Sequence, residues 1–229
     1  MKNTLLLTAA LAVLVSQNAV AHTQGAYVGL QGGVNGTLVT GDTTITNLTA
    51  PDVQHKKLNA FSAGLMGGFH GGYGWRVNQH YLALDAAFNM YGGGAQDRFV
   101  ADSPVVSSFN LNPRYTTQVS GKWGYVMGDW MPYVRLGVSY GKLRGTAGFN
   151  NNTLSFSSTK NAGLWGALGG VGVSYAVNKN WRVAGEVTYT RYNSLTQNFT
   201  QTLSGSNYQS ERTVRPHVGE MTLKVSYAF

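Results

Sequence analysis

The chain has 229 residues, of which 11% are charged, with a formal net charge of +8 and no cysteine. The absence of cysteine excludes a disulfide framework and any thiolate or cysteine-ligated metal chemistry. A positive net charge suits anionic surfaces, but the basic residues are scattered over the chain, so we expect no nucleic-acid partner.

The first 21 residues have the organisation of a secretory signal peptide. Lys2 precedes an apolar run over residues 5–15, and Ala19-Val20-Ala21 forms a small-residue cleavage pattern before His22. An N-terminal membrane anchor is the alternative, but the apolar run is shorter than a membrane-spanning helix needs. We therefore expect a signal peptide over residues 1–21 and one mature domain over residues 22–229.

The mature sequence alternates apolar and polar residues with a period of two, which is typical of β-strands. The final stretch shows the pattern clearly, with Leu223, Val225, Tyr227 and Phe229 on one parity and Lys224 on the other. The segments with this pattern are 26–36, 59–76, 81–91, 115–126, 133–143, 163–177, 181–192 and 219–229.

The connections between these segments are of two kinds. Tight turns rich in Asn, Gly and Asp follow the second, fourth and sixth segments. Long polar connections follow the first, third, fifth and seventh, and alternating stretches within them, such as residues 198–203, are expected to extend hairpins. We call the two ends the short-turn end and the long-loop end. This layout is typical of an outer-membrane barrel.

Alternation alone does not decide which face is buried, so a soluble barrel or sandwich with an apolar interior is an alternative. Two features favour a membrane barrel. Aromatic residues on the apolar parity gather near both ends of the segments, as Trp75 and Trp123 do at one end and Tyr140 and Trp165 at the other. The many glycines at strand positions would leave gaps in a soluble core.

We therefore predict an all-β fold, an eight-stranded antiparallel up-and-down transmembrane β-barrel with short periplasmic turns and four long extracellular loops. The first strand "AYVGLQGGVNG" and the final "MTLKVSYAF" resemble the small eight-stranded barrels of Gram-negative outer membranes, the group of the OmpA membrane domain, OmpX and the opacity proteins. The resemblance implies an outer-membrane location, contact with outer-membrane lipid, and recognition by the barrel-assembly machinery. It implies an assembly signal made of Leu223, Val225, Tyr227 and Phe229.

The polar parity carries charged residues that a closed barrel would enclose. Buried charges are costly unless they are paired. Similar distances from the short turns predict the pairs Asp85–Lys122 and Glu186–Lys224, and His70 is expected to bond within the lumen. A structural plug and an ion path are both open interpretations. The predicted lumen network comprises Asp85, Lys122, Arg135, Arg182, Glu186, Glu220 and Lys224.

A second set of basic residues lies near the long-loop end. Lipopolysaccharide presents phosphates at that height, and Arg or Lys there gains charge-assisted contacts. Solvated rim charges without a ligand are the alternative. The possible lipopolysaccharide contacts are Arg114, Lys142, Arg144, Lys160, Arg191, Arg212 and Arg215.

The sequence predicts neither an enzyme nor a cofactor or metal site, because the histidines do not stand in an arrangement with a nucleophile and an orienting acid. The predicted function is therefore structural, with surface contacts such as adhesion or binding of an extracellular or host protein through the loops, as the resemblance implies. A narrow channel for small solutes or ions is the alternative.

Overall fold

The computed structural model describes residues 22, 24–47, 53–92, 106–151, 154–203 and 206–229. Side chains are described for residues 22, 24–41, 61–92, 114–142, 163–194, 196 and 213–229. The predicted signal peptide, residues 1–21, lies outside the described residues. Within the described part of the chain, no helix has the length and apolar character needed to cross a membrane.

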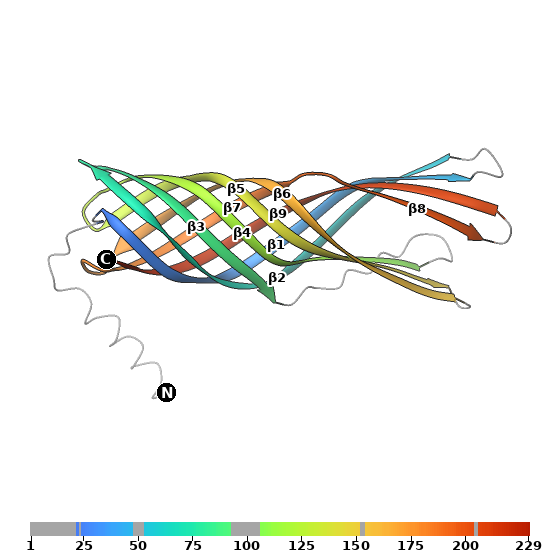
Figure 1. Ribbon diagram of the computed structural model, residues 1–229, viewed down its shortest axis with the longest axis horizontal. Helices are drawn as coiled ribbons and strands as arrows, with labels where there is room; N and C mark the ends of the chain where they lie inside the picture. Colours follow the sequence, from blue (N-terminus) through green and yellow to red (C-terminus); the bar gives the residue numbers. More distant parts are fainter. Residues whose placement is uncertain (1–21, 23, 48–52, 93–105, 152–153, 204–205) are drawn as a thin grey trace, which may run out of the picture.

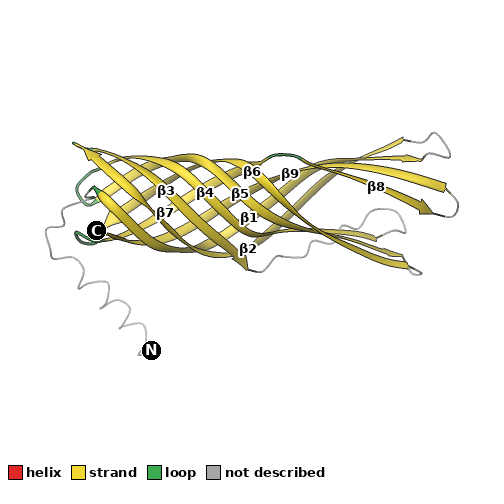
Figure 2. Cartoon of the chain, viewed as in Figure 1, coloured by secondary structure: helices red, strands yellow, loops and turns green. Residues whose placement is uncertain are grey.

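Antiparallel strands form one closed sheet (Figures 1 and 2). Strands β1 to β7 pair in chain order, β9 pairs with β7 and β8, and β1 pairs with β9 from Tyr27–Ala228 to Asn47–Tyr208. The last pairing closes the cylinder. The strands are β1 (Gly25–Asn47), β2 (Val53–Val77), β3 (His80–Gly92), β4 (Val106–Tyr125), β5 (Trp130–Asn151), β6 (Leu154–Ala176), β7 (Trp181–Tyr192), β8 (Leu195–Leu203) and β9 (Ser206–Ala228).

Strands β7 and β8 follow one another along the same position in the barrel wall, so together they count as one strand of the barrel. Both pair with β9, Arg191 opposite His217 and Leu195 opposite Val214. Three residues lie between these pairs on the β7–β8 side and two on β9, which corresponds to a β-bulge. With β7 and β8 counted as one, the cylinder has eight strands, and the predicted eight-stranded antiparallel barrel is confirmed.

At the long-loop end the strands continue past the closed part of the cylinder. The hairpins stay paired as far as Thr46–Val53, Asn151–Leu154 and Leu203–Ser206. Because β3 ends at Gly92 and β8 pairs only with β9 among the described strands, the extensions separate into two sheets, β2-β1-β9-β8 and β4-β5-β6. These diverge at the end of the molecule opposite the C-terminus in Figure 1. The long connections that the sequence predicts as polar loops are thus largely paired β-strands.

The barrel wall is apolar outside and polar inside. Leu30, Leu136 and Leu223 point outward, with 71%, 71% and 68% of their surface exposed. Arg135 and Lys224 point inward and are 1% and 2% exposed. A water-soluble barrel would bury its leucines and expose its charges. The alternative of a soluble barrel with an apolar interior is therefore excluded.

Aromatic side chains lie on the outer wall at both ends. Tyr140 and Trp165 pack together at the long-loop end, with ring centroids 5.1 Å apart, and Tyr227 and Phe229 do so at the short-turn end, at 5.2 Å. The Phe229 N–H donates to the Ala26 carbonyl at 3.0 Å. The terminal residue is thus bonded into the closing seam between β9 and β1.

Candidate functional site

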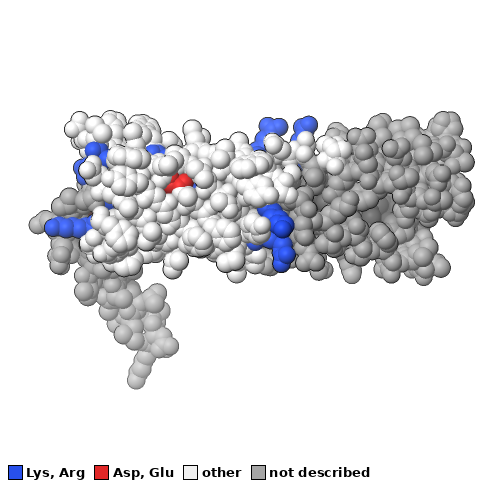
Figure 3. Space-filling model, in the orientation of Figure 1, with Lys and Arg blue, Asp and Glu red and all other residues white. Residues whose placement is uncertain are grey.

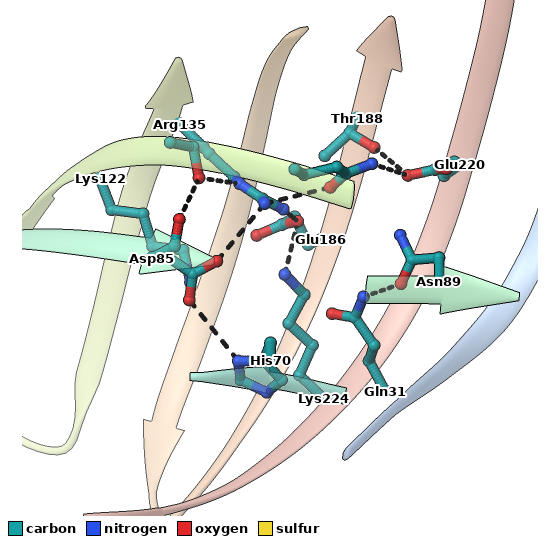
Figure 4. Close-up of polar contacts among 12 residues, drawn as sticks. Gln31, His70, Asp85, Asn89, Lys122, Arg135, Glu186, Thr188, Glu220 and Lys224 are labelled. Carbon is teal, nitrogen blue, oxygen red and sulfur yellow. Dashed lines mark hydrogen bonds and ion pairs between the residues drawn. The ribbon is translucent and has the colours of Figure 1, made fainter. Parts of the chain in front are cut away.

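Arg135 on β5 is the centre of the polar network that fills the lumen (Figure 4). Its guanidinium lies 2.7 Å from Glu186 Oε1 on one side and 3.4 Å from Asp85 Oδ1 on the other. It also donates to Ser120 Oγ at 2.7 Å and to Gln118 Oε1 at 3.1 Å. One planar cation thereby connects β3, β4, β5 and β7 across the barrel interior.

Asp85 on β3 is contacted mainly by side chains from other strands. Lys122 Nζ on β4 lies 2.9 Å from Asp85 Oδ2, and the Tyr27 hydroxyl on β1 donates to the same oxygen at 2.8 Å. The ring of His70 on β2 lies 3.6 Å away. Asp85 is 1% exposed, so its charge depends on these protein partners for stabilisation.

Glu186 on β7 is the corresponding acid on the other wall. Its Oε1 accepts bonds from Arg135 and from Lys224 Nζ on β9, both at 2.7 Å, and its Oε2 accepts the Tyr133 hydroxyl at 2.8 Å. Both pairs predicted from the sequence, Asp85–Lys122 and Glu186–Lys224, are therefore present in the lumen.

Two other predicted members occupy different levels of the lumen. Glu220 accepts hydrogen bonds from Tyr91, from Thr188 Oγ1 at 3.0 Å and from Gln118 Nε2 at 3.3 Å. Gln118 also accepts from Arg135, so it relays between the central cluster and Glu220. Arg182 instead donates to the Tyr81 hydroxyl at 3.1 Å.

Sequence reasoning missed the tyrosines that complete the network. Tyr27 and Tyr133 are each 6% exposed and donate to the two central acids. Their parity was the available signal, because Tyr27 shares a face with Gln31 and Tyr133 shares a face with Arg135. An aromatic residue near a strand end has two possible roles, in the outer belt or in the lumen, and only parity separates them.

His22 closes the lumen at the short-turn end. It is 1% exposed, and its ring lies edge-on to Tyr81, with centroids 6.2 Å apart. Burial, together with the nearby positive charge of Arg182, lowers the pKa of His22 to about 4. The imidazole is therefore neutral at ordinary pH.

The basic residues at the long-loop end form two groups on the outer wall. Arg191 on β7 lies directly opposite His217 on β9, and Arg215 is two residues further along the same face. The Tyr189 hydroxyl and His217 Nδ1 are 2.6 Å apart. In the second group, Lys142 on β5 lies opposite Tyr115, the neighbour of Arg114.

These groups stand at the edge of an almost uncharged wall. On the face shown in Figure 3, Lys and Arg gather at the two ends of the described barrel, with little charge between them. The side chains of the other three predicted rim residues, Arg144, Lys160 and Arg212, lie outside those that the structure describes.

Among the described residues, no group of three or more His, Asp or Glu side chains is arranged to hold a metal ion. The central charged residues of the lumen, Asp85, Arg135 and Glu186, are engaged in ion pairs with one another. The described residues therefore form a polar barrel interior and a basic outer rim.

The sequence matches the family model described as outer membrane protein beta-barrel domain over residues 6–229. It is 24% identical over 135 residues to the 31 kDa outer-membrane immunogenic proteins of Brucella melitensis and Brucella suis, a match that covers 58% of this chain and 56% of each relative. The chain thus spans a little over half the length of these curated relatives.

Two solved structures match this chain. The outer membrane protein OprG from Pseudomonas aeruginosa matches with a TM-score of 0.50 and 17% identity, over 91% of this chain and 99% of that one. Ail, the attachment invasion locus protein of Yersinia pestis, matches with a TM-score of 0.36 and 14% identity, over 90% of this chain and 100% of that one.

Proposed function

This chain belongs to the outer membrane protein β-barrel family and lies in the outer membrane, and from this premise we propose that it is a non-conducting, non-enzymatic barrel. In this proposal it supports the membrane and makes surface contacts through its paired extracellular extensions. The observation that carries the proposal is the bridge from Asp85 through Arg135 to Glu186, which crosses the lumen between opposite walls.

The bridge favours a plug over an ion path for a physical reason. A permeating ion must replace its water with protein ligands and then leave again. Here the charged groups already satisfy one another at 2.7–3.4 Å and are almost fully buried. Opening a path would separate several of these contacts at once, and each separated charge would lose several kcal/mol of stabilisation.

The test combines conductance with trimming of an extension. Purified protein in planar bilayers is expected to show no steady single-channel current, and Lys122→Ala is expected to leave this unchanged because Arg135 still bridges the lumen. Replacing residues 197–212 by a two-residue Asn-Gly turn is expected to keep the closed barrel but reduce attachment of expressing cells to host-cell surfaces.

These two measurements distinguish a plugged barrel with surface contacts from a narrow channel. A strong current in Lys122→Ala, or in the unmodified protein, would favour the narrow channel. Unchanged attachment after trimming, with the barrel folded by gel mobility, would contradict a contact role for the β8–β9 extension.

Assembly is part of the same proposal. The outward Leu223, Val225 and Phe229, with the adjacent Tyr227, form the signal that the assembly machinery recognises.

We further propose that the basic rim binds lipopolysaccharide phosphates. Arg191 and Arg215 flank His217 just beyond the aromatic belt at the long-loop end, and Arg114 and Lys142 form a second group. Cations on adjacent strands of one face lie roughly 5–8 Å apart, which allows two of them to contact one phosphate group.

The combined variant Lys142→Ala with Arg191→Ala is expected to weaken lipid A binding roughly 30-fold, since each of the two lost charge-assisted bonds contributes on the order of 1 kcal/mol. Binding to reconstituted protein is measured by titration with lipid A at two salt concentrations. Lys179→Ala, in the turn at the opposite end, is the matched control and should have no effect. Equal affinity of the double variant and the unmodified protein would refute the contact.

A further inference from the structure

The lumen contains a small cavity beside the two lysines. It has a volume of about 40 Å³ and is lined by residues that include Lys122, Lys224, Arg182, Ser174 and Ser226. Asp85 and Glu186, which pair with the two lysines, are not among the lining residues. The lining therefore carries three cationic side chains and no carboxylate.

Hydrogen-bond donors predominate around this space. Each ammonium group has three N–H donors, and the bonds to the central acids use one each on Lys122 and Lys224. Tyr27 and Tyr133 also line the cavity, and their hydroxyl protons are directed to Asp85 and Glu186, so they add no donor for an occupant. An occupant that only accepts hydrogen bonds fits this lining better than one that must also donate.

The charges around the cavity also favour an anionic occupant. Two ammonium groups whose side chains line one cavity repel each other, and the repulsion is stronger in the barrel interior than in bulk water. A negative charge between them offsets that repulsion without disturbing the ion pairs behind. The space is a few times the minimum that one water molecule requires, which is enough for a monatomic anion.

We propose that this cavity is a binding site for a small inorganic anion of the halide class, held by Lys122, Lys224 and Arg182. The anion would join β4, β9 and β7 at the level below the central bridge. This site is independent of the surface contacts proposed above, because it concerns only the interior of the barrel.

The test uses bromide, which scatters anomalously. Crystals of the full chain grown in sodium bromide are expected to show an anomalous peak in the cavity, within hydrogen-bond distance of the Lys122 and Lys224 ammonium groups. In solution, replacing gluconate by bromide or chloride at constant ionic strength is expected to raise Tm by roughly 2–4 °C. A cavity without an anomalous peak would overturn the proposal.

Variants separate a bound anion from a general salt effect. Ala184 also lines the cavity, so Ala184→Leu fills the space without changing any charge and is expected to abolish both the peak and the halide effect on Tm. Lys122→Gln is expected to do the same. Lys179→Gln removes an exposed cation from the turn between β6 and β7 and should leave the effect intact. An equal halide effect in all four proteins would overturn the proposal.

Discussion

Replacing Arg135 by leucine is expected to lower the free energy of unfolding by about 3–5 kcal/mol, the range found when one partner of a buried ion pair is removed. Arg135 is 1% exposed and holds Glu186 at 2.7 Å and Asp85 at 3.4 Å. Without the guanidinium, two buried carboxylates lose a shared cation. Urea unfolding of the detergent-solubilised barrel, followed by tryptophan fluorescence, measures the change.

Two further variants test whether the loss of stability comes from the buried bridge of Arg135 and not from the loss of any positive charge. Arg135→Lys keeps the charge but cannot bond to Ser120, Gln118 and Glu186 at the same time, so an intermediate loss is expected. Lys142→Leu removes a cation from the outer rim, where exposed charges contribute about 0–1 kcal/mol. If Arg135→Leu were no less stable than Lys142→Leu, the central bridge would have no stabilising role.

Gly33→Ala is expected to impair closure of the barrel. A Cβ built at Gly33 would lie 2.0 Å from the Met221 carbonyl oxygen and 2.9 Å from Thr222 Cα, both backbone atoms of β9. Because β9 pairs with β1 along the closing seam, the clash would be relieved only by moving the strands apart. Forced overpacking of this kind costs about 1–3 kcal/mol.

The neighbouring glycine provides the control. A Cβ at Gly32 would meet only the Met66 carbonyl oxygen, at 3.7 Å, so Gly32→Ala is expected to change stability by less than about 0.5 kcal/mol. The heat-modifiable gel shift of refolded protein reports the closed fraction for both variants. Equal closed fractions for the two would show that the seam tolerates a methyl group at Gly33.

Much of the lumen network followed from periodicity and position along the strand. Asp85 and Lys122 lie on inward parities at similar distances from the short-turn end, and so do Glu186 and Lys224. Such residues on neighbouring strands come within reach of each other. The bridge from Arg135 was beyond this reasoning, because contacts across a barrel depend on strand tilt and stagger, which accumulate from strand to strand.

The extensions illustrate a second limit. Residues 198–203 alternate, but so do many polar loops rich in Thr and Asn, and the alternation does not reveal a partner. The β8–β9 register, Leu195 opposite Val214, is a property of backbone pairing between two segments. The bulge at Asn193 and Ser194 that directs β8 away from β6 follows from that register.

By itself, the sequence determined the barrel class, the strand number and the parity of each strand, because a side-chain period of two is a local property of the extended backbone. It also placed Phe229 on the lipid-facing parity. Only the tertiary structure decided which of the enclosed charges meet, where the cavity beside Lys122 and Lys224 lies, and which glycines the seam requires. These depend on distances across the lumen and between strands, and closure of the cylinder sets those distances.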